Sequence, residues 1–218
     1  MGFEAENMDV HFNKCASDYD RHFYEESGMR EFYDEIEKQI NMCGKPKNIL
    51  VLGCGTGLEI ERIKHLAIVT AIDISSGMLA ELKKKELEQG VTLNTICDSY
   101  FNVHLTENHF DLVLSTYSFH HFTVQQKMQL YRKIYNCLKV NACFINGDTV
   151  CRDKDTEINL LNSAKELYQK QQLSFGSIHI DVPLALETEI GLISDTGFSS
   201  ISVERRWNKT ALIKAIKG

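Results

Sequence analysis

Gly53, Gly55 and Gly57 form the group of residues whose spacing points most clearly to chemistry. They stand in the run Gly-Cys-Gly-Thr-Gly, directly after the apolar residues 49–52. Such an apolar run predicts a strand buried on both faces, as in parallel sheets. Glycines allow a tight turn and let a ligand lie against the backbone. Because ligands in open α/β sheets bind at the carboxyl ends of the strands, this loop predicts a binding site.

The spacing of the glycines separates one class of ligand from another. A dinucleotide fingerprint, Gly-x-Gly-x-x-Gly, needs a third glycine at position 58 or 60, and these positions hold Leu58 and Ile60. The phosphate-loop pattern fails too, because no Gly-Lys-Ser/Thr follows. Asp73 ends the next apolar run, 18 positions after Gly55. That offset is close to the ~20 at which a carboxylate meets ribose hydroxyls in such folds.

The same kinds of residue recur along the chain. Asp73-x-Ser-x-x-Met78 continues the second strand, and residues 91–98 end in Asp98 followed by Ser99. Phe110-Asp-Leu-Val-Leu-Ser115 precedes the pair His120-His121, and Ala16-x-x-Tyr19-Asp20 precedes the first strand. Together with the glycine loop, these patterns resemble the motifs of class I S-adenosylmethionine (SAM) dependent methyltransferases that act on small molecules. The resemblance covers roughly residues 11–217.

The resemblance implies a cofactor, SAM, and a set of contacts. In that family the glycine turn holds the methionine end, the carboxylate after the second strand binds ribose, and the Met packs on adenine. The carboxylate after the third strand accepts from the adenine amino group. The implied cofactor contacts are Tyr19, Gly53, Cys54, Gly55, Asp73, Ile74, Met78, Asp98, Ser99 and Ser115. Tyr19 would belong to an arm that folds over the cofactor.

The loop after the fourth strand faces the methyl group and the acceptor in the resembling family. His120 is therefore the candidate catalytic residue, as a general base near neutral pH. The alternative stays open that paired histidines in this loop only hold local packing. A base is needed only for a weakly acidic hydroxyl or a protonated amine, and nothing in the sequence requires a metal.

The order of elements predicts a Rossmann-like three-layer α/β sandwich with a seven-stranded, mostly parallel sheet. Its last two strands are expected to form the C-terminal antiparallel hairpin that separates this family from dinucleotide-binding sheets. Strands are expected at 49–52, 67–73, 91–98, 110–116, 142–147, 199–207 and 210–217, and helices at 29–43, 58–66, 77–90, 124–138, 156–172 and 184–195. Asn141 replaces a family glycine and must take a left-handed turn.

We expect one domain, since 218 residues suffice for a single core. Residues 1–44 would form a helical cover, 45–150 the SAM-binding core, 151–183 an insertion on the substrate side, and 184–218 the closing helix and hairpin. Residues 173–183 read as irregular. The acceptor pocket is expected to draw on the insertion.

Composition favours a cytoplasmic protein. Hydrophobic content of 43% and charged content of 25% are ordinary for a soluble globule, and the net charge of −6 argues against a broad nucleic-acid surface. No apolar run reaches the ~18 residues of a membrane span, and the polar N-terminus does not resemble a signal peptide. Seven cysteines without a Cys-x-x-Cys pair suit a reducing compartment better than a disulfide framework.

The sequence thus predicts a SAM-dependent methyltransferase that moves a methyl group to a small molecule by in-line displacement. One alternative is a tRNA-modifying enzyme that uses a SAM derivative, which would need a basic channel. Another is a SAM-binding regulatory protein without catalysis. A nicotinamide oxidoreductase is disfavoured by Leu58, Ile60 and the expected hairpin. The acceptor and the oligomeric state are not specified.

Overall fold

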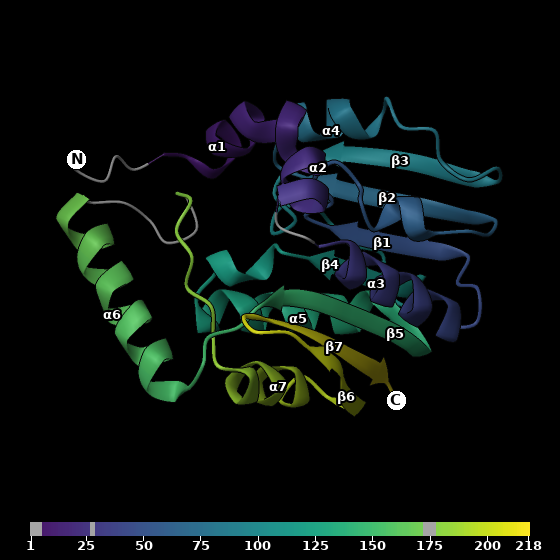
Figure 1. Cartoon of the computed structure of the whole chain (residues 1–218). Helices are drawn as coiled ribbons and strands as arrows, with labels where there is room; N and C mark the ends of the chain where they lie inside the picture. The colour runs from purple at the N-terminus through teal and green to yellow at the C-terminus, as the bar shows by residue number, and fades with distance from the viewer. Residues whose placement is uncertain (1–5, 27–28, 172–177) are drawn as a thin grey trace.

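A twisted seven-stranded sheet forms the centre of the protein, a computed structural model in which residues 6–26, 29–171 and 178–218 are described. The strand order is β3-β2-β1-β4-β5-β7-β6, and only the pairings of β7 are antiparallel (Figure 1). The strands are β1 Asn48–Leu52, β2 Ala67–Asp73, β3 Val91–Cys97, β4 Phe110–Thr116, β5 Leu138–Thr149, β6 Phe198–Arg206 and β7 Thr210–Lys217. The predicted Rossmann-like sheet with a C-terminal hairpin is confirmed.

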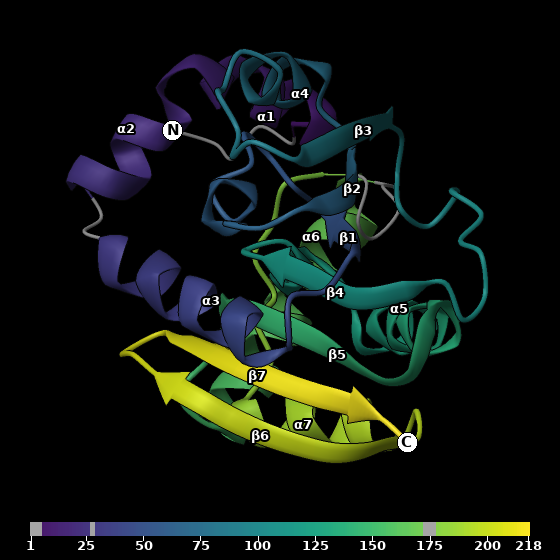
Figure 2. The ribbon, with the colours of Figure 1, turned by 90° about the vertical axis from the view of Figure 1, so that its right-hand side faces the viewer.

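Helices cover both faces of the sheet, as Figure 2 shows for α3 and α5. The helices are α1 Met8–Cys15, α2 Tyr19–Arg21, α3 Arg30–Met42, α4 Ser76–Leu82, α5 Val124–Cys137, α6 Lys154–Gln171 and α7 Leu186–Ser194. Successive residues of β1 alternate between the two layers. Leu50 and Leu52 pack in the core with α5 and α7, whereas Ile49 and Val51 pack in the core with α3 and α4.

Two expected helices are much shorter than the sequence suggested. The segment 58–66 contains only the 3₁₀ turn Ile60–Arg62, because Leu58, Ile60 and Ile63 are all drawn into the core before β2 begins. The helix expected at 77–90 stops as α4 at Leu82, the last residue of its buried stripe. Burial by the sheet, more than helical propensity, sets both lengths.

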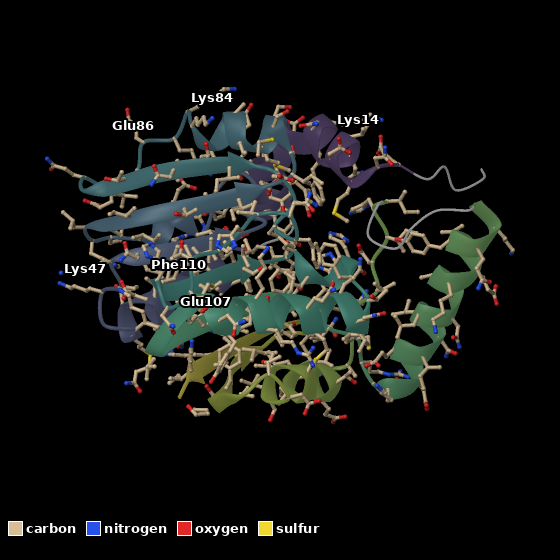
Figure 3. The ribbon with its side chains drawn as sticks, turned by 180° about the vertical axis from the view of Figure 1, so that it is seen from behind. Lys14, Lys47, Lys84, Glu86, Glu107 and Phe110 are labelled. Carbon is tan, nitrogen blue, oxygen red and sulfur yellow. The ribbon has the colours of Figure 1, made fainter. Side chains whose placement is uncertain are left out.

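The lysine-rich run after α4 belongs to a surface of mixed charge. Lys84 pairs with Glu81 at 2.7 Å, and Lys85 pairs with Glu61 at 2.7 Å and with Asp20 at 2.6 Å. Lys84 and Glu86 both point outward in Figure 3. This run therefore has carboxylate partners already and offers no bare phosphate-binding patch.

Strand β5 is longer than expected at both ends. It begins at Leu138 and passes through Asn141, whose φ of 63° confirms the expected left-handed residue. Its far end extends to Thr149, past the expected end at residue 147. The extension carries Asp148 into the interior beside the histidine pair, where Asp148 is 3% exposed.

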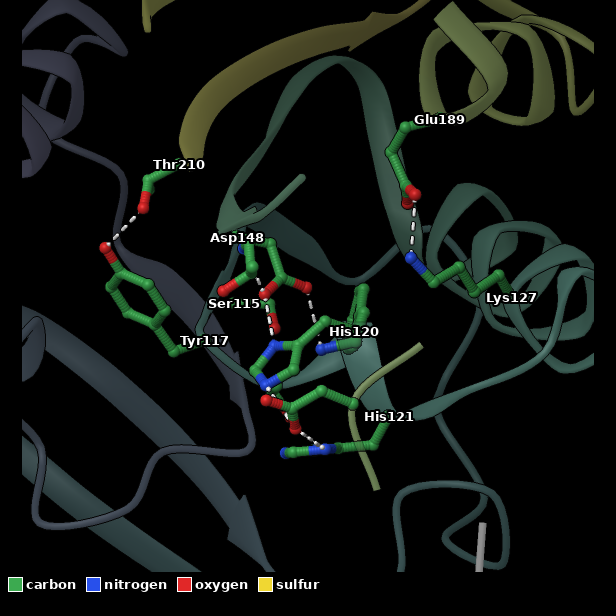
Figure 4. Close-up of polar contacts among 12 residues, drawn as sticks. Ser115, Tyr117, His120, His121, Lys127, Asp148, Glu189 and Thr210 are labelled. Carbon is green, nitrogen blue, oxygen red and sulfur yellow. Dashed lines mark hydrogen bonds and ion pairs between the residues drawn. The ribbon is translucent and has the colours of Figure 1, made fainter. Parts of the chain in front are cut away.

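A buried ion pair fixes the helical layer beneath the histidine loop. Lys127 of α5 and Glu189 of α7 lie 2.7 Å apart with side chains 1% and 2% exposed (Figure 4). The Tyr131 hydroxyl donates to the same carboxylate. Helix α5 begins with a capping box between Thr123 and Gln126. The histidine loop is thus fixed at the end where it joins α5.

The N-terminal arm and the chain after α6 meet at one end of the molecule. Asn7 pairs with Ile178 in an antiparallel bridge, and the His179 N–H donates to the Glu6 carbonyl at 3.0 Å. The Val182 N–H donates to the His120 carbonyl at 2.7 Å. Residues 178–183 are irregular as expected, and the rest of the segment expected to be irregular, residues 173–177, lies outside the described residues.

All seven cysteines are free thiols, as the sequence suggested. Among the described residues no helix is long and apolar enough to cross a membrane.

Candidate active site

The glycine loop is folded in a way that only glycines allow without strain. Gly53, Gly55 and Gly57 have φ of 66°, 49° and 80°. A Cβ on Gly53 would lie 2.0 Å from Ser118 Oγ, so the loop and the end of β4 touch directly. A Cβ on Gly55 would meet nothing closer than 4.0 Å, because it would project into a cavity.

Asp73 organises this loop and also faces the cavity. Its Oδ2 accepts the Gly55 N–H at 2.7 Å, and its Oδ1 accepts the Ser75 N–H at 2.8 Å. Burial raises the pKa of Asp73, although the two backbone donors oppose that shift. Ser75 caps α4 by accepting the Met78 N–H at 3.0 Å, and this places Met78 on the cavity wall.

We call this hollow the cofactor cavity. Its wall comes from the ends of β1, β2, β3 and β4 and from the N-terminal arm. The lining residues are Met8, Phe12, Tyr19, Gly53, Gly55, Asp73, Ile74, Met78, Ser99, Tyr100, Phe101, Thr116, Tyr117, Ser118, His121, Phe122 and Gln126. None of these described lining residues is Lys or Arg.

The arm is fastened to the glycine loop by polar contacts. Asp20 accepts from the Thr56 hydroxyl and pairs with Lys85, which sets the neighbouring Tyr19 against the cavity. Asn13 Oδ1 accepts the Gly77 N–H at 2.7 Å. Burial, followed by nearby carboxylates, raises the pKa of Tyr19, so its ring stays neutral.

A second hollow, which we call the histidine cleft, adjoins the first. Its lining residues are His11, Phe12, Cys15, Asp18, Tyr19, Arg21, His22, Phe23, Met29, Tyr117, His120, His121, Thr149, His179, Asp181 and Thr210. Four residues, Phe12, Tyr19, Tyr117 and His121, line both hollows. Tyr117 has a positive φ of 48°, and its hydroxyl lies 3.0 Å from Thr210 Oγ1 (Figure 4).

His120 lies between two carboxylates. Its Nδ1 is 2.6 Å from Asp148 Oδ1, and its Nε2 is 3.5 Å from Asp181 Oδ1 (Figure 4). Burial alone would lower the pKa of His120, but Asp148 and then Asp181 attract its proton and raise the pKa to about 9. His120 therefore carries a proton at neutral pH.

His121 has the opposite electrostatic environment. Burial, followed by repulsion from His120, lowers its pKa to about 4. Its Nδ1 is 3.2 Å from Asp181 Oδ1 but makes no hydrogen bond, although the residue is only 2% exposed. His121 is therefore a neutral imidazole with an unsatisfied ring nitrogen.

Comparison with known proteins shows what the chain is similar to. A methyltransferase domain model matches residues 49–141. An uncharacterised methyltransferase of Oceanobacillus iheyensis is 28% identical, over 62% of this chain and 62% of its own length. A carboxy-S-adenosyl-L-methionine synthase of Campylobacter concisus is 24% identical, over 79% of this chain and 78% of its own. Residues 49–141 thus match a methyltransferase domain, and the chain is similar in sequence to SAM-dependent methyltransferases.

A solved structure shows the same fold. The complex of DhpI with S-adenosylhomocysteine (SAH) superimposes with a TM-score of 0.71, at 17% identity, over 95% of this chain and 94% of that one. The chain spans less than two thirds of the Oceanobacillus relative, so the match to that protein concerns only part of its length.

Most of the residues expected to contact the methyltransferase cofactor line one cavity. These are Tyr19, Gly53, Gly55, Asp73, Ile74, Met78 and Ser99. His120 does not line the cofactor cavity; it lines the histidine cleft, where its neighbour His121 reaches both hollows.

Three expected contact residues do not line the cofactor cavity. The Cys54 thiol is buried and faces the Gly55 carbonyl, and the buried Ser115 hydroxyl donates to the Leu52 carbonyl at 3.1 Å. Asp98 is exposed and accepts the Ser99 N–H at 2.6 Å. Cys54 therefore packs under the glycine loop, Ser115 links β4 to β1, and Asp98 holds the backbone of Ser99.

Sequence reasoning missed the aromatic wall of the cofactor cavity and both carboxylates beside His120. Tyr100 and Phe101 directly follow Asp98-Ser99 at a strand end, and that position could have drawn attention to them. Asp148 lay beyond the expected end of its strand. Asp181 reaches His120 and His121 only through tertiary folding, and no local pattern marks it.

Proposed function

We propose that the protein binds SAM in the cofactor cavity and catalyses methyl transfer to a small-molecule acceptor held in the histidine cleft. The observation that carries this proposal is that the two hollows adjoin and share four lining residues, Phe12, Tyr19, Tyr117 and His121. A transferase needs one site for the donor and one for the acceptor, with a shared boundary where the reacting atoms meet.

The residues present fit SAM. The position where a Gly55 Cβ would stand is open, so a ligand can lie against the backbone there. Asp73 presents a carboxylate to ribose hydroxyls, and the thioether of Met78 suits a flat adenine surface. The lining lacks Lys and Arg among its described residues, which favours a positively charged ligand without a 2′-phosphate. When bound, SAM supplies a methyl group carried on a positively charged sulfur.

The chain's own part is to bind, orient and exclude water. Tyr19 and Tyr117 offer neutral aromatic faces at the boundary of the two hollows, where they would stabilise a cation. The N-terminal arm, fixed by Asp20 and Asn13, would keep water from that boundary. Positioning of this kind supplies up to ~7–11 kcal/mol of a reaction barrier. Asp98 would reach the adenine amino group from the rim.

His120 would contact the acceptor. With a pKa of about 9 it enters the reaction protonated, so it serves as a general base only after it loses that proton. In the protonated state its Nε2–H, which lies 3.5 Å from Asp181 Oδ1, would orient an acceptor by donating a hydrogen bond to it. A small molecule, more than a nucleic acid, suits a cleft on a protein whose net charge is −6.

A second candidate function is carboxylation of SAM, suggested by the name of the Campylobacter relative that aligns with 79% of this chain. A carboxylated SAM carries one more negative charge, and a cavity that binds it would gain from a nearby cation. None of the described residues that line the cofactor cavity is Lys or Arg. We therefore rank carboxylation below methyl transfer.

Mass spectrometry of the cofactor after incubation tests the proposal. The purified protein is incubated with SAM and a panel of phenols, carboxylic acids, amines and phosphonates, and the SAH formed is quantified. Acceptor-dependent SAH supports methyl transfer, whereas a carboxylated SAM supports the second candidate. SAM binding without either product would contradict both and indicate a regulatory protein.

A further inference from the structure

We propose that His120 Nε2, His121 Nδ1 and Asp181 Oδ1 form a binding site for a divalent transition-metal ion, of which Zn²⁺ is the best match. The three potential ligand atoms lie within 4.8 Å of one another. They come from the loop after β4 and from the segment after α6, so the site forms only when the tertiary structure brings these segments together.

The distances already approach those of a metal-ligand set. Metal bonds of ~2.0–2.1 Å at tetrahedral angles put neighbouring ligand atoms ~3.4 Å apart. Asp181 Oδ1 lies 3.5 Å from His120 Nε2 and 3.2 Å from His121 Nδ1. The third distance, between the two imidazole nitrogens, is at most 4.8 Å. The two nitrogens would need to approach each other by no more than ~1.4 Å to bind one metal ion.

A carboxylate behind His120 orients the ring as in known metal sites. Metal-binding histidines almost always donate their other ring N–H to a carboxylate, a carbonyl or water. Asp148 Oδ1 lies 2.6 Å from His120 Nδ1, and Asp148 is itself held by the Phe119 N–H at 2.9 Å. In this arrangement Nδ1 of His120 faces Asp148 and Nε2 faces Asp181, so a metal ion would take the place of the Nε2 proton, which is released on binding.

His121 adds an independent observation. Its Nδ1 is a buried polar atom without a hydrogen bond, and such atoms are costly in a folded protein. Its ring is fixed at its edge by Phe12, with ring centroids 5.9 Å apart. Its one close polar neighbour is Asp181 Oδ1 at 3.2 Å, and a metal ion between the two would give the nitrogen a bond in place of that contact.

The chemistry of the ligands selects the class of metal. Two imidazoles and one carboxylate suit zinc and its transition-metal neighbours, whereas Mg²⁺ and Ca²⁺ prefer oxygen ligands. Three protein ligands with a free position characterise catalytic zinc sites, as opposed to closed structural ones. All three residues line the histidine cleft, so the free position faces the space proposed for the acceptor.

The consequence for the reaction rests on the proposed function, whereas metal binding does not. An acceptor hydroxyl bound to the metal loses its proton to solvent more readily, because the cation stabilises the oxyanion. His121 also lines the cofactor cavity, so the oxyanion would stand at the boundary of the two hollows. The preferred acceptors would then be alcohols, phenols or acids that bind metal through oxygen.

Calorimetric titration of the untagged protein with Zn²⁺ alone tests the site. We expect about one equivalent bound with a Kd near or below ~1 μM. Asp181→Asn should weaken binding at least ~100-fold. Asp148→Asn, which alters the orienting partner of His120 but removes no metal ligand, should weaken it ~10–100-fold. The Asp181 side chain is 57% exposed, so its variant tests the site without endangering the fold.

His109→Ala is the matched control, because His109 is an exposed histidine outside the cleft. This variant should bind Zn²⁺ as the wild type does. Co²⁺ in place of Zn²⁺ should give visible absorption bands that change when azide occupies the free position. An absence of saturable Zn²⁺ binding, or unchanged affinity in Asp181→Asn, would overturn the proposal. SAM affinity is measured separately, without metal, and should be the same in the wild type and in Asp181→Asn. If neither protein binds SAM, the proposed function is contradicted, whereas the metal site is not.

Discussion

The cofactor cavity and the histidine cleft are neighbours that are built in different ways. The cavity is made by loops that leave adjacent strands, and each loop is shaped by residues close in sequence, such as Ser75 and Met78. The cleft joins residues that are far apart, since Asp148 and Asp181 meet His120 across 28 and 61 positions. Short motifs can specify the first kind of site, whereas only the finished fold creates the second.

Their electrostatics differ as well. Asp73 is the carboxylate held by backbone donors in the cofactor cavity, which suits a cationic ligand with hydroxyl groups. The cleft gathers imidazoles between carboxylates, with one histidine pKa at about 9 and the next at about 4. Donor binding and acceptor chemistry are thus assigned to separate groups that share a wall. The two sites should respond independently to substitution.

Asp148→Ala should have the largest effect and should separate the two regions. It removes the acceptor of the His120 ring and of the Phe119 N–H, and it leaves a buried charged imidazole with less compensation. We expect a loss of ~3–5 kcal/mol of unfolding free energy in denaturant titration. Asp111→Ala is the control: its carboxylate also bonds Lys139 and the Asn48 N–H, but it is 27% exposed and should cost ~1 kcal/mol.

If the cavity and the cleft are independent, the folded fraction of Asp148→Ala should bind SAM with a Kd within ~3-fold of the wild-type value. That factor corresponds to less than ~1 kcal/mol of binding free energy. A loss of SAM affinity comparable to the loss of stability would break the distinction between cavity and cleft.

Glu59, two residues after the glycine loop, should make the free energy of unfolding depend on pH. This carboxyl is 2% exposed, accepts from the Thr116 hydroxyl at 3.2 Å, and has a pKa raised by burial from 4.5 to about 8. Between these pKa values the folded protein keeps a proton that the unfolded chain releases, so stability falls as pH rises through this window.

Glu59→Gln should remove that dependence. We expect wild-type unfolding free energy to fall by ~3 kcal/mol more than that of Glu59→Gln between pH 5 and pH 8. Parallel curves for the two proteins would show that Glu59 ionises normally in the folded state.

Asp73→Asn and Asp98→Asn sharpen the comparison within the cofactor region. Asp73 is the last residue of β2 and Asp98 directly follows β3, but only Asp73 lines the cavity. We expect Asp73→Asn to weaken SAM binding ~100-fold, because it disturbs two ribose contacts and the acceptor of the Gly55 N–H. Asp98→Asn should cost ~10-fold, as one rim contact does. Calorimetry measures both, and equal losses would contradict the assignment of distinct roles.

Gly53→Ala and Gly44→Ala compare a constrained glycine with a free one. Their φ values are similar, 66° and 77°, so the backbone strain is matched. A Cβ at Gly53 meets Ser118 at 2.0 Å, whereas nothing lies within 4 Å of a Cβ at Gly44. We expect Gly53→Ala to cost ~2 kcal/mol more in denaturant unfolding. Equal costs would mean that the loop yields easily at Ser118.

The sequence predicted the sheet well for a physical reason. Buried strands carry continuous apolar runs, and β2, β4 and β7 coincide with the runs at 67–73, 110–116 and 210–217. The helix expected at 58–66 failed because tertiary burial shortened it. The cleft could not be foreseen, since Asp181 and His121 are 60 positions apart and meet only in the folded chain.

Calorimetric titration of the wild-type protein with SAM, SAH and NAD tests the central claim most directly. Roughly micromolar binding of SAM and SAH, with no heat from NAD, is the result expected of a cavity in which Asp73 and the glycine loop hold an adenosyl ligand. No binding of SAM or SAH, or binding of NAD with equal affinity, would contradict the assignment of the cofactor cavity and with it the proposed methyl transfer.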